Sequence, residues 1–218
     1  MNNKTYYHLI LDRSGSMTSC ADATISGFNE QIQMIRDMQR LHSDQEILVS
    51  LTTFNHTVTH PVNCSAPDQV RELDRESYVP DGSTALLDAI GESVMSLKAR
   101  AGNEFEHNKA SAIVIILTDG HENASKLFNI KNVRNMVREL EDTGKWTFTF
   151  LGADMAAIDQ AENLNIRRAN AARYSKEDSE KTFMNLSQNL TTYIMEKKSG
   201  KVAKDFLKKD NIDSEDLF

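Results

Sequence analysis

Five oxygen-bearing side chains in three separate segments are the residues best suited to chemistry in this sequence. They are Asp12, Ser14 and Ser16 after a first apolar stretch, Thr84 ahead of a helical pattern, and Asp119 one residue after a long apolar run. A hard cation such as Mg²⁺ takes oxygen ligands in near-octahedral geometry at about 2.0–2.1 Å. The small Gly15 lets a tight loop turn several of these oxygens toward one point. The residue types therefore predict a site for one divalent cation.

The elements that position these residues alternate between strands and helices. Strands are expected at 6–11, 46–54, 57–62, 112–117, 146–151 and 168–174, and helices at about 18–39, 84–101, 130–141, 154–164 and 176–196. The apolar run Ala112–Leu117 is typical of a central parallel strand that is covered on both faces. Asn55-His56 looks like a hairpin turn, which makes one strand antiparallel. The pattern predicts a doubly wound, Rossmann-like α/β fold with a mostly parallel six-stranded sheet, one antiparallel edge strand and helices on both faces.

The position of the acids in this predicted sheet supports the metal hypothesis. In open α/β sheets, ligands collect at the carboxyl ends of the strands, near the point where the strand order reverses. Asp12 and Asp119 each follow a predicted strand, and Thr84 follows the segment 63–83, which we expect to form a short helix and a long surface loop. The three segments are therefore expected to meet at one edge of the sheet.

The C-terminal segment differs in composition from the rest of the chain. We expect one domain over residues 1–196 and a charged tail over residues 197–218, in which lysines are followed by acids. A solvated, partly helical tail is the favoured interpretation. Docking through its apolar residues is the alternative; these are Phe206, Leu207, Leu217 and Phe218.

The bulk composition narrows the class of protein. With 39% hydrophobic residues and few Pro or Gly, the chain should fold compactly. Its net charge of -7 argues against a nucleic-acid groove, which needs clustered Lys and Arg. Cys20 and Cys64 fit no metal or disulfide pattern and are expected to be free thiols. Without a visible secretory signal or membrane span, we expect a cytoplasmic protein, and its oligomeric state stays open.

The same residues resemble a known family. Asp12-x-Ser14-x-Ser16, a Thr ahead of the helical sequence Ala-Leu-Leu-Asp-Ala, and Thr-Asp-Gly after an apolar strand are together similar to the von Willebrand factor A domains. The likeness covers about residues 5–195 and is greatest to small single-domain bacterial or phage members, which would add host cytoplasm or virion as locations. Ala85 stands where many members have Pro, a departure that concerns loop stiffness more than ligation.

The resemblance implies a complete metal-ion-dependent adhesion site. In such a site Ser14, Ser16 and Thr84 would ligate the metal directly, and Asp12 and Asp119 would act in part through water. The resemblance also implies Mg²⁺, with Mn²⁺ or Ca²⁺ as alternatives, and a protein partner that offers an Asp or Glu carboxylate to the metal.

The expected function is that of a metal-dependent protein-interaction module, an adaptor or assembly subunit and not an enzyme. The sequence lacks a Gly-x-Gly-x-x-Gly, a phosphate-binding Gly-x4-Gly-Lys-Ser/Thr and a Gly-x-Ser-x-Gly nucleophile sequence. The alternative is a Mg²⁺-dependent metallohydrolase or phosphatase that uses the same ion, with Glu122, His121 or Asp154 as its general base. In a third interpretation the ion is only structural, and the tail or the long loop contacts the partner.

Overall fold

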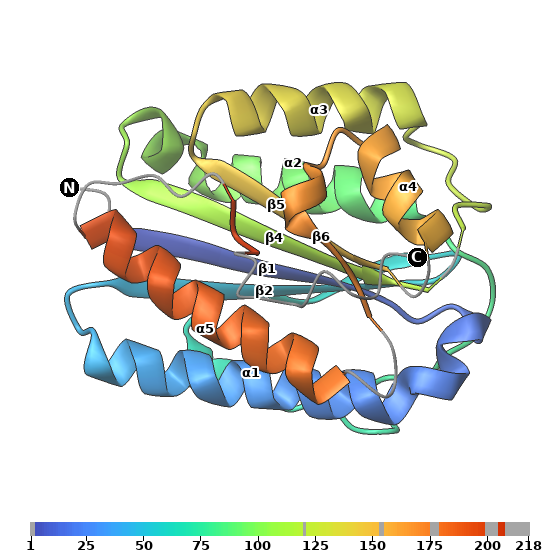
Figure 1. Ribbon diagram of the computed structural model, residues 1–218, viewed down its shortest axis with the longest axis horizontal. Coiled ribbons are helices and arrows are strands. Elements are labelled where there is room, and N and C mark those ends of the chain that lie inside the picture. The colour runs from blue at the N-terminus through green and yellow to red at the C-terminus, as the bar shows by residue number, and fades with distance from the viewer. Residues whose placement is uncertain (1–2, 120, 153–154, 175–178, 199–204, 208–218) are drawn as a thin grey trace, which may run out of the picture.

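The computed structural model describes residues 3–119, 121–152, 155–174, 179–198 and 205–207 (Figure 1). In chain order the elements are β1 (Lys4–Asp12), the 3-10 turn η1 (Gly15–Cys20), α1 (Ala21–Leu41), β2 (Glu46–Phe54), β3 (Val58–Ser65), η2 (Pro67–Gln69), α2 (Leu86–Glu106), β4 (Ala110–Thr118), α3 (Ile130–Asp142), β5 (Trp146–Gly152), α4 (Met155–Asn163), η3 (Arg168–Asn170), β6 (Ala171–Arg173) and α5 (Ser179–Lys198).

The six strands form one sheet in the order β3-β2-β1-β4-β5-β6. β1 pairs in parallel with both β2 and β4, β5 and β6 continue the parallel part, and β3 is the antiparallel edge strand. The predicted fold class is thereby confirmed. Because the chain extends the sheet first on the β2 side of β1 and later on the β4 side, the strand order reverses between β1 and β4. Ligand sites in open α/β sheets lie at this point.

Helices cover both faces of the sheet, with α1 and α5 on one side and α2, α3 and α4 on the other (Figure 1). The alternation of side chains along β1 supplies both cores. Tyr7, Leu9 and Leu11 belong to the buried cluster on the α1 and α5 side, while Tyr6 and Ile10 belong to the cluster on the α2 side. A strand that is buried on both faces is fixed in register, so the residues at its end are fixed as well.

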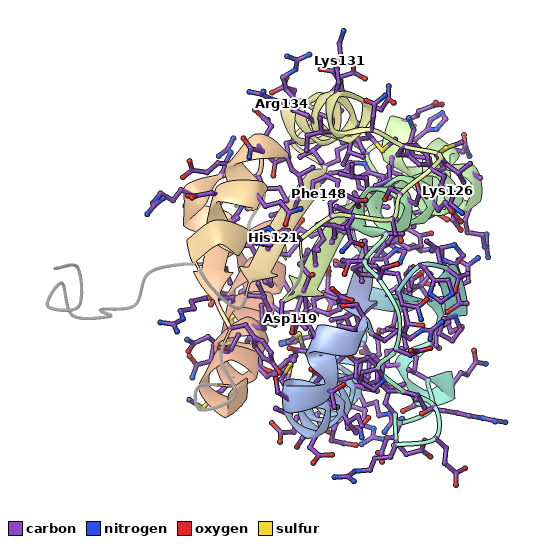
Figure 2. All side chains as sticks on the ribbon, turned by 90° about the vertical axis from the view of Figure 1, so that its right-hand side faces the viewer. Asp119, His121, Lys126, Lys131, Arg134 and Phe148 are labelled. Atoms are coloured by element: carbon purple, nitrogen blue, oxygen red, sulfur yellow. The ribbon has the colours of Figure 1, made fainter. Side chains whose placement is uncertain are left out.

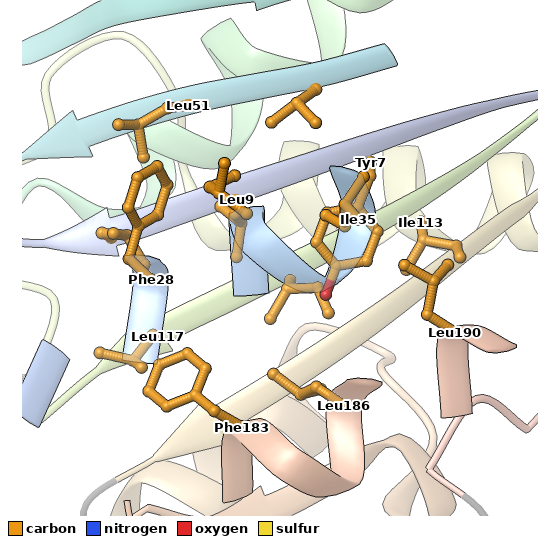
Figure 3. Close-up of a cluster of buried hydrophobic side chains, with 14 of the residues drawn as sticks. Tyr7, Leu9, Phe28, Ile35, Leu51, Ile113, Leu117, Phe183, Leu186 and Leu190 are labelled. Atoms are coloured by element: carbon orange, nitrogen blue, oxygen red, sulfur yellow. The ribbon is translucent and has the colours of Figure 1, made fainter. Parts of the chain in front are cut away.

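The α1 and α5 side depends on one close approach. α5 packs beside α1, and Phe183 of α5 lies in the cluster that Figure 3 shows together with Phe28 of α1. A Cβ atom on Gly27 would lie only 1.9 Å from the Phe183 ring. A glycine at position 27 is therefore what lets the Phe183 ring rest against the backbone of α1.

The end of α2 differs from the prediction. The helix was expected to stop at Gly102 but continues to Glu106. Glycine inside a helix costs roughly 0.8–1.0 kcal/mol relative to alanine. Burial of Ala101 and Phe105 in the core on either side of Gly102 offsets that cost, because a fully buried Phe contributes roughly 1.5–3 kcal/mol.

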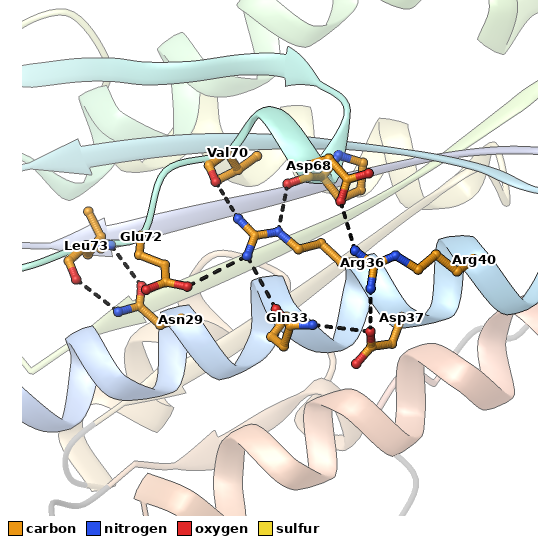
Figure 4. A network of polar contacts seen from close by, with 10 residues as sticks. Asn29, Gln33, Arg36, Asp37, Arg40, Asp68, Val70, Glu72 and Leu73 are labelled. Atoms are coloured by element: carbon orange, nitrogen blue, oxygen red, sulfur yellow. Dashed lines mark hydrogen bonds and ion pairs between the residues drawn. The ribbon is translucent and has the colours of Figure 1, made fainter.

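The long connection between β3 and α2 is fastened along α1 (Figure 4). The Arg36 guanidinium donates to the carbonyl oxygens of Val70 at 2.7 Å and Pro67 at 3.2 Å. The Asn29 side chain donates to the Leu73 carbonyl at 2.9 Å and accepts from the Leu73 amide at 2.8 Å. This connection leads to Thr84, so α1 helps to position one of the predicted metal ligands.

Part of the C-terminal segment docks on the domain, against the expectation of a solvated tail. Phe206 is 2% exposed and its ring lies 6.2 Å from that of Tyr193 in α5. The Asn170 side-chain oxygen accepts hydrogen bonds from the backbone amides of Phe206 and Leu207. The hydrophobic gain from burying an aromatic ring explains why this segment packs despite its charged neighbours. Leu217 and Phe218 lie outside the described residues.

Candidate metal centre

Asp12 ends β1 and lies completely buried at the reversal of strand order. Both of its carboxylate oxygens accept hydrogen bonds from the protein. The Ser14 amide donates to Oδ1 at 2.7 Å, and the Thr118 hydroxyl at the end of β4 donates to Oδ2 at 2.5 Å. These two bonds hold the carboxylate in one orientation.

Burial makes the Asp12 carboxylate unstable as an anion. Burial, with a smaller contribution from the charge of Asp119, raises the pKa of Asp12 to about 6, against the hydrogen bonds from Thr118 and Ser14, which lower it. Such a carboxylate is stabilised when a cation binds beside it. The chemistry of Asp12 therefore fits a metal site.

Ser14, Ser16 and Asp119 bring three further oxygen-bearing side chains together at the same edge. Ser14 Oγ lies 3.2 Å from Ser16 Oγ, and Ser16 Oγ donates to Asp119 Oδ1 at 2.7 Å. Ser14 is buried, Ser16 is exposed and Asp119 is half-buried, so this chain of oxygens runs from the interior to the surface. Figure 2 shows Asp119 at the end of β4, beside the η1 turn.

The loop that carries Thr84 is hydrogen-bonded to the loop after β1. The Gly15 amide donates to the Gly82 carbonyl at 3.0 Å, and the Asp81 amide donates to the Arg13 carbonyl at 2.8 Å. Gly82 has a φ of +75°, a conformation that glycine adopts without steric cost. Thr84 itself is 3% exposed. The predicted third segment thus joins the other two at this edge.

Asn123 and Asn55 fix the backbone around Thr84. The Asn123 side chain accepts from the Thr84 amide at 2.9 Å, while the Thr84 carbonyl accepts from the Asn123 amide at 3.0 Å. The Asn55 side chain donates to the Asp81 carbonyl at 2.9 Å, and its carbonyl accepts from the Ala85 amide at 2.7 Å. Thr84 is therefore held from the β2–β3 turn on one side and from the loop after β4 on the other.

Four of these supporting residues were not predicted from the sequence. They are Asn55, Tyr78, Thr118 and Asn123, and the Tyr78 hydroxyl donates to the Asp12 carbonyl. Thr118 carried a signal, because it stands beside Asp119 in the Thr-Asp-Gly sequence. The other three lie in turns or loops where no periodicity marks them.

Glu122 is a structural carboxylate. Its Oε2 accepts from the Leu87 amide at 2.9 Å and from the Ser125 hydroxyl at 2.7 Å, and its Oε1 accepts from the Ser125 amide at 2.7 Å. It thus caps the start of α2 and ties down the loop after β4. His121 beside it is exposed. Asp154 lies outside the described residues.

Hydroxyls must supply part of any metal coordination at this edge. Within the described ranges, no group of three or more His, Cys, Asp or Glu side chains is arranged to hold a metal ion. The site offers two carboxylates, Asp12 and Asp119, with neutral hydroxyls between them. Neutral oxygen ligands suit Mg²⁺ and Mn²⁺ better than softer metals.

Solved structures share this fold at low sequence identity. The vWF domain of the type V pili tip protein Mfa5 from Porphyromonas gingivalis matches with a TM-score of 0.65 at 9% identity, covering 89% of this chain and 97% of that one. The PilB minor pilin from Streptococcus sanguinis matches with a TM-score of 0.61 at 14% identity, covering 87% and 62%. Proximal thread matrix protein 1 from the mussel byssus, with a zinc-occupied MIDAS motif, matches with a TM-score of 0.55 at 14% identity, covering 84% and 45%.

This chain therefore spans less than two thirds of the PilB and byssus proteins. No curated protein matches it. The expected cytoplasmic location is wrong on this comparison, because the similar structures are a minor pilin, a pilus tip protein and a byssus matrix protein. Among the helices that the structure describes, none has the length and apolar composition to cross a membrane.

The family assignment comes from the sequence itself. The family model of the von Willebrand factor type A domain matches residues 8–192, which include all five predicted ligand positions, the second half of β1 and all of the strands from β2 to β6. The chain belongs to the von Willebrand factor type A domain family.

Proposed function

We propose that this chain is a protein-interaction module that holds one divalent cation and binds a carboxylate of a protein partner through it. The proposed ligand set is Asp12, Ser14, Ser16, Thr84 and Asp119. Mg²⁺ is the proposed ion, with Mn²⁺ or Ca²⁺ as alternatives. The zinc-occupied MIDAS motif of the byssus protein and the pilus proteins of the same fold support both parts of the proposal.

The single observation that carries the proposal is the hydrogen bond between Ser16 and Asp119. It links η1, which follows β1, to the residue after β4 across 103 positions of the sequence. Buried Asp12 stands behind this pair, fixed by Ser14 and Thr118. A core would normally hold an apolar residue at position 12, because burial of a carboxylate costs several kcal/mol unless charge or hydrogen bonds offset it.

The protein side chains have separate tasks in this arrangement. Ser14, Ser16 and Thr84 would bind the cation as neutral ligands, whereas Asp12 and Asp119 would offset part of its charge. The bound cation supplies the positive charge that draws in a carboxylate oxygen, which the chain's net charge of -7 would not do. Because the three direct ligands are neutral, the cation would remain electrophilic toward such a partner.

A hydrolase that uses the same ion is not favoured by the site. Glu122, the candidate carboxylate base on the loop after β4, has both carboxylate oxygens engaged with backbone amides and the Ser125 hydroxyl. A general base needs a free acceptor atom within reach of the proton that it removes. Capture of a partner is the function that these contacts fit better.

A displayed library of random peptides tests this function without knowledge of the natural partner. The full chain is immobilised in Mg²⁺, and bound peptides are released with EDTA. We expect the released peptides to share an Asp or Glu whose replacement by the amide abolishes binding. The Asp119→Ala variant should yield no peptides on release with EDTA. The Asp81→Ala variant, which removes an exposed acid on the neighbouring loop, should yield the same peptides as the wild type. Peptides without an acid, or equal release by plain buffer, would contradict the proposal.

A further inference from the structure

A basic surface borders the proposed metal site in a protein that is acidic as a whole. Residues 121–138 contain four Lys or Arg and one acid, whereas the chain has 25 Lys and Arg against 32 Asp and Glu. The cationic residues are Lys126, Lys131, Arg134 and Arg138. Figure 2 shows the first three on the same side of the molecule as Asp119 and His121, around the carboxyl edge of the sheet.

Three of these charges, on Lys126, Lys131 and Arg134, have no structural task that the contacts reveal. Lys126, Lys131 and Arg134 are exposed, and none of them forms a salt bridge with another residue in the described part of the chain. Lys131 lies in the first turn of α3, where a cation opposes the helix dipole. The helix start is instead capped by Asn129 and Asn132. Helix stability therefore does not explain the basic residues.

The one acid of this segment does not neutralise them. Glu122 accepts hydrogen bonds from Leu87, Ala124 and Ser125 and so faces the start of α2. Beside it, an open groove of about 640 Å³ is lined by His121, Glu122, Ile130 and Arg134 on one wall and by α4 residues, among them Asp159, on the other. His121 follows Asp119 by two positions, so this groove begins next to the proposed metal site.

Apolar side chains stand between the cations. Leu127 is 72% exposed and Ile130 is 44% exposed, while other apolar residues of the same region, such as Val133 and Val137, are buried. We call the five residues Lys126, Leu127, Ile130, Lys131 and Arg134 the basic ridge. Mixed apolar and cationic side chains suit a protein segment better than a nucleic-acid backbone, which is recognised mainly through its phosphates.

We propose that the basic ridge binds an acidic, partly apolar segment of the same partner whose carboxylate reaches the metal. This inference rests on the proposed function, because the metal anchors one carboxylate and the ridge binds the acids that follow it. The charge complementarity would steer acidic partners to the site and select them over segments with a single acid. The rest of the chain, being acidic, would repel such a segment.

Fluorescence anisotropy with two labelled peptides tests the ridge. One peptide carries three glutamates that alternate with leucine, and its match carries a single glutamate and two glutamines. Binding of both peptides is measured in Mg²⁺ and in EDTA, for the wild-type chain and for the ridge variant Lys126→Gln/Lys131→Gln/Arg134→Gln. The matched control is Arg71→Gln/Arg100→Gln/Lys109→Gln, which removes three equally exposed cations that lie outside the ridge.

We expect the ridge variant to bind the three-glutamate peptide about tenfold more weakly than the wild type, from three exposed charge pairs, and the control variant to bind it normally. Equal binding of the three-glutamate peptide by the ridge variant and the wild type would overturn the inference. So would a wild type that binds neither peptide, or one that binds a labelled oligothymidine more tightly than the three-glutamate peptide. Loss of binding in EDTA together with equal binding by the ridge variant would leave the metal function standing. A ridge effect that persists unchanged in EDTA would instead count against the metal function.

Discussion

Ser16 Oγ donates a 2.7 Å hydrogen bond to Oδ1 of Asp119, although 103 positions separate the two residues. The pair joins the loop after β1 to the end of β4, the two strands between which the strand order reverses. Asp12 lies behind it as a fully buried carboxylate. Without a bound cation, the negative charge of the buried Asp12 carboxylate destabilises the fold.

Asp12→Asn should stabilise the metal-free protein and abolish metal binding. Burial raises the pKa of Asp12 from 3.8 to about 6. At neutral pH the carboxylate is therefore charged in both states, but its charge costs free energy in the folded state relative to the unfolded state. Removing the charge should raise the free energy of unfolding by up to about 3 kcal/mol, measured by urea denaturation in EDTA. The Asn keeps the shape, and the Thr118 hydroxyl can rotate to accept from its amide. Exposed Asp81→Asn is the control; a destabilised Asp12→Asn would refute this prediction.

Thr118→Val should weaken metal binding although Thr118 is not a proposed ligand. Its hydroxyl orients Asp12, and loss of such a supporting contact typically reduces metal affinity by about 10–100-fold. Thr149→Val on the adjacent β5 is a matched control, since the buried Thr149 hydroxyl has no hydrogen-bond partner in the described structure. Mn²⁺ titrations of both variants check this. Equal affinities for the two would show that Asp12 needs no orienting hydroxyl.

Gly82→Ala should disturb the loop that carries Thr84. At a φ of +75° a Cβ atom would lie 2.4 Å from Nδ1 of His56, and the left-handed conformation itself costs roughly 1–2 kcal/mol. A lower melting temperature and weaker Mn²⁺ binding are expected. Gly102→Ala, in α2 with nothing within 4 Å of the new Cβ, should instead stabilise the protein by about 0.5–1 kcal/mol. The prediction fails if both variants melt alike.

Lys197 should make stability rise with pH. Burial lowers its pKa from 10.5 to about 7, while its ammonium donates to the Lys4 carbonyl and the Thr5 hydroxyl. Between these values the unfolded chain binds a proton that the folded chain does not, so the free energy of unfolding increases as pH rises from 7 toward 10. In the Lys197→Met variant, this increase of the free energy of unfolding with pH should be absent. Parallel pH profiles of wild type and variant, from urea denaturation, would contradict it.

The strands and the two acids were predictable because strong local signals mark them. The all-buried β4 has a continuous apolar sequence, and the rule that ligands collect at strand ends places Asp12 and Asp119 together. The mostly parallel sheet followed from the alternation of strands and helices. These features depend on nearest neighbours in sequence and on a chirality that all proteins share.

The supports of the site were not predictable, because they depend on long-range contacts. Tyr78 and Asn123 reach the site from loops without periodicity, and their partners are 66 and 39 positions away. The end of α2 was misplaced because burial of Phe105 outweighs the local preference of Gly102. Phe206 docks for the same reason, against the charge of its neighbours. In each case tertiary packing overrides a local signal.

The most direct test of the central claim is a Mn²⁺ titration followed by electron paramagnetic resonance, which counts bound ions. The wild type should bind one Mn²⁺ per chain at this site, and Ser14→Ala/Ser16→Ala should weaken that binding at least about tenfold. Ser19→Ala/Ser83→Ala, two exposed serines of the same loops, should bind as the wild type does. No bound Mn²⁺ in the wild type, or unchanged binding in Ser14→Ala/Ser16→Ala, would contradict the claim that these hydroxyls hold a metal.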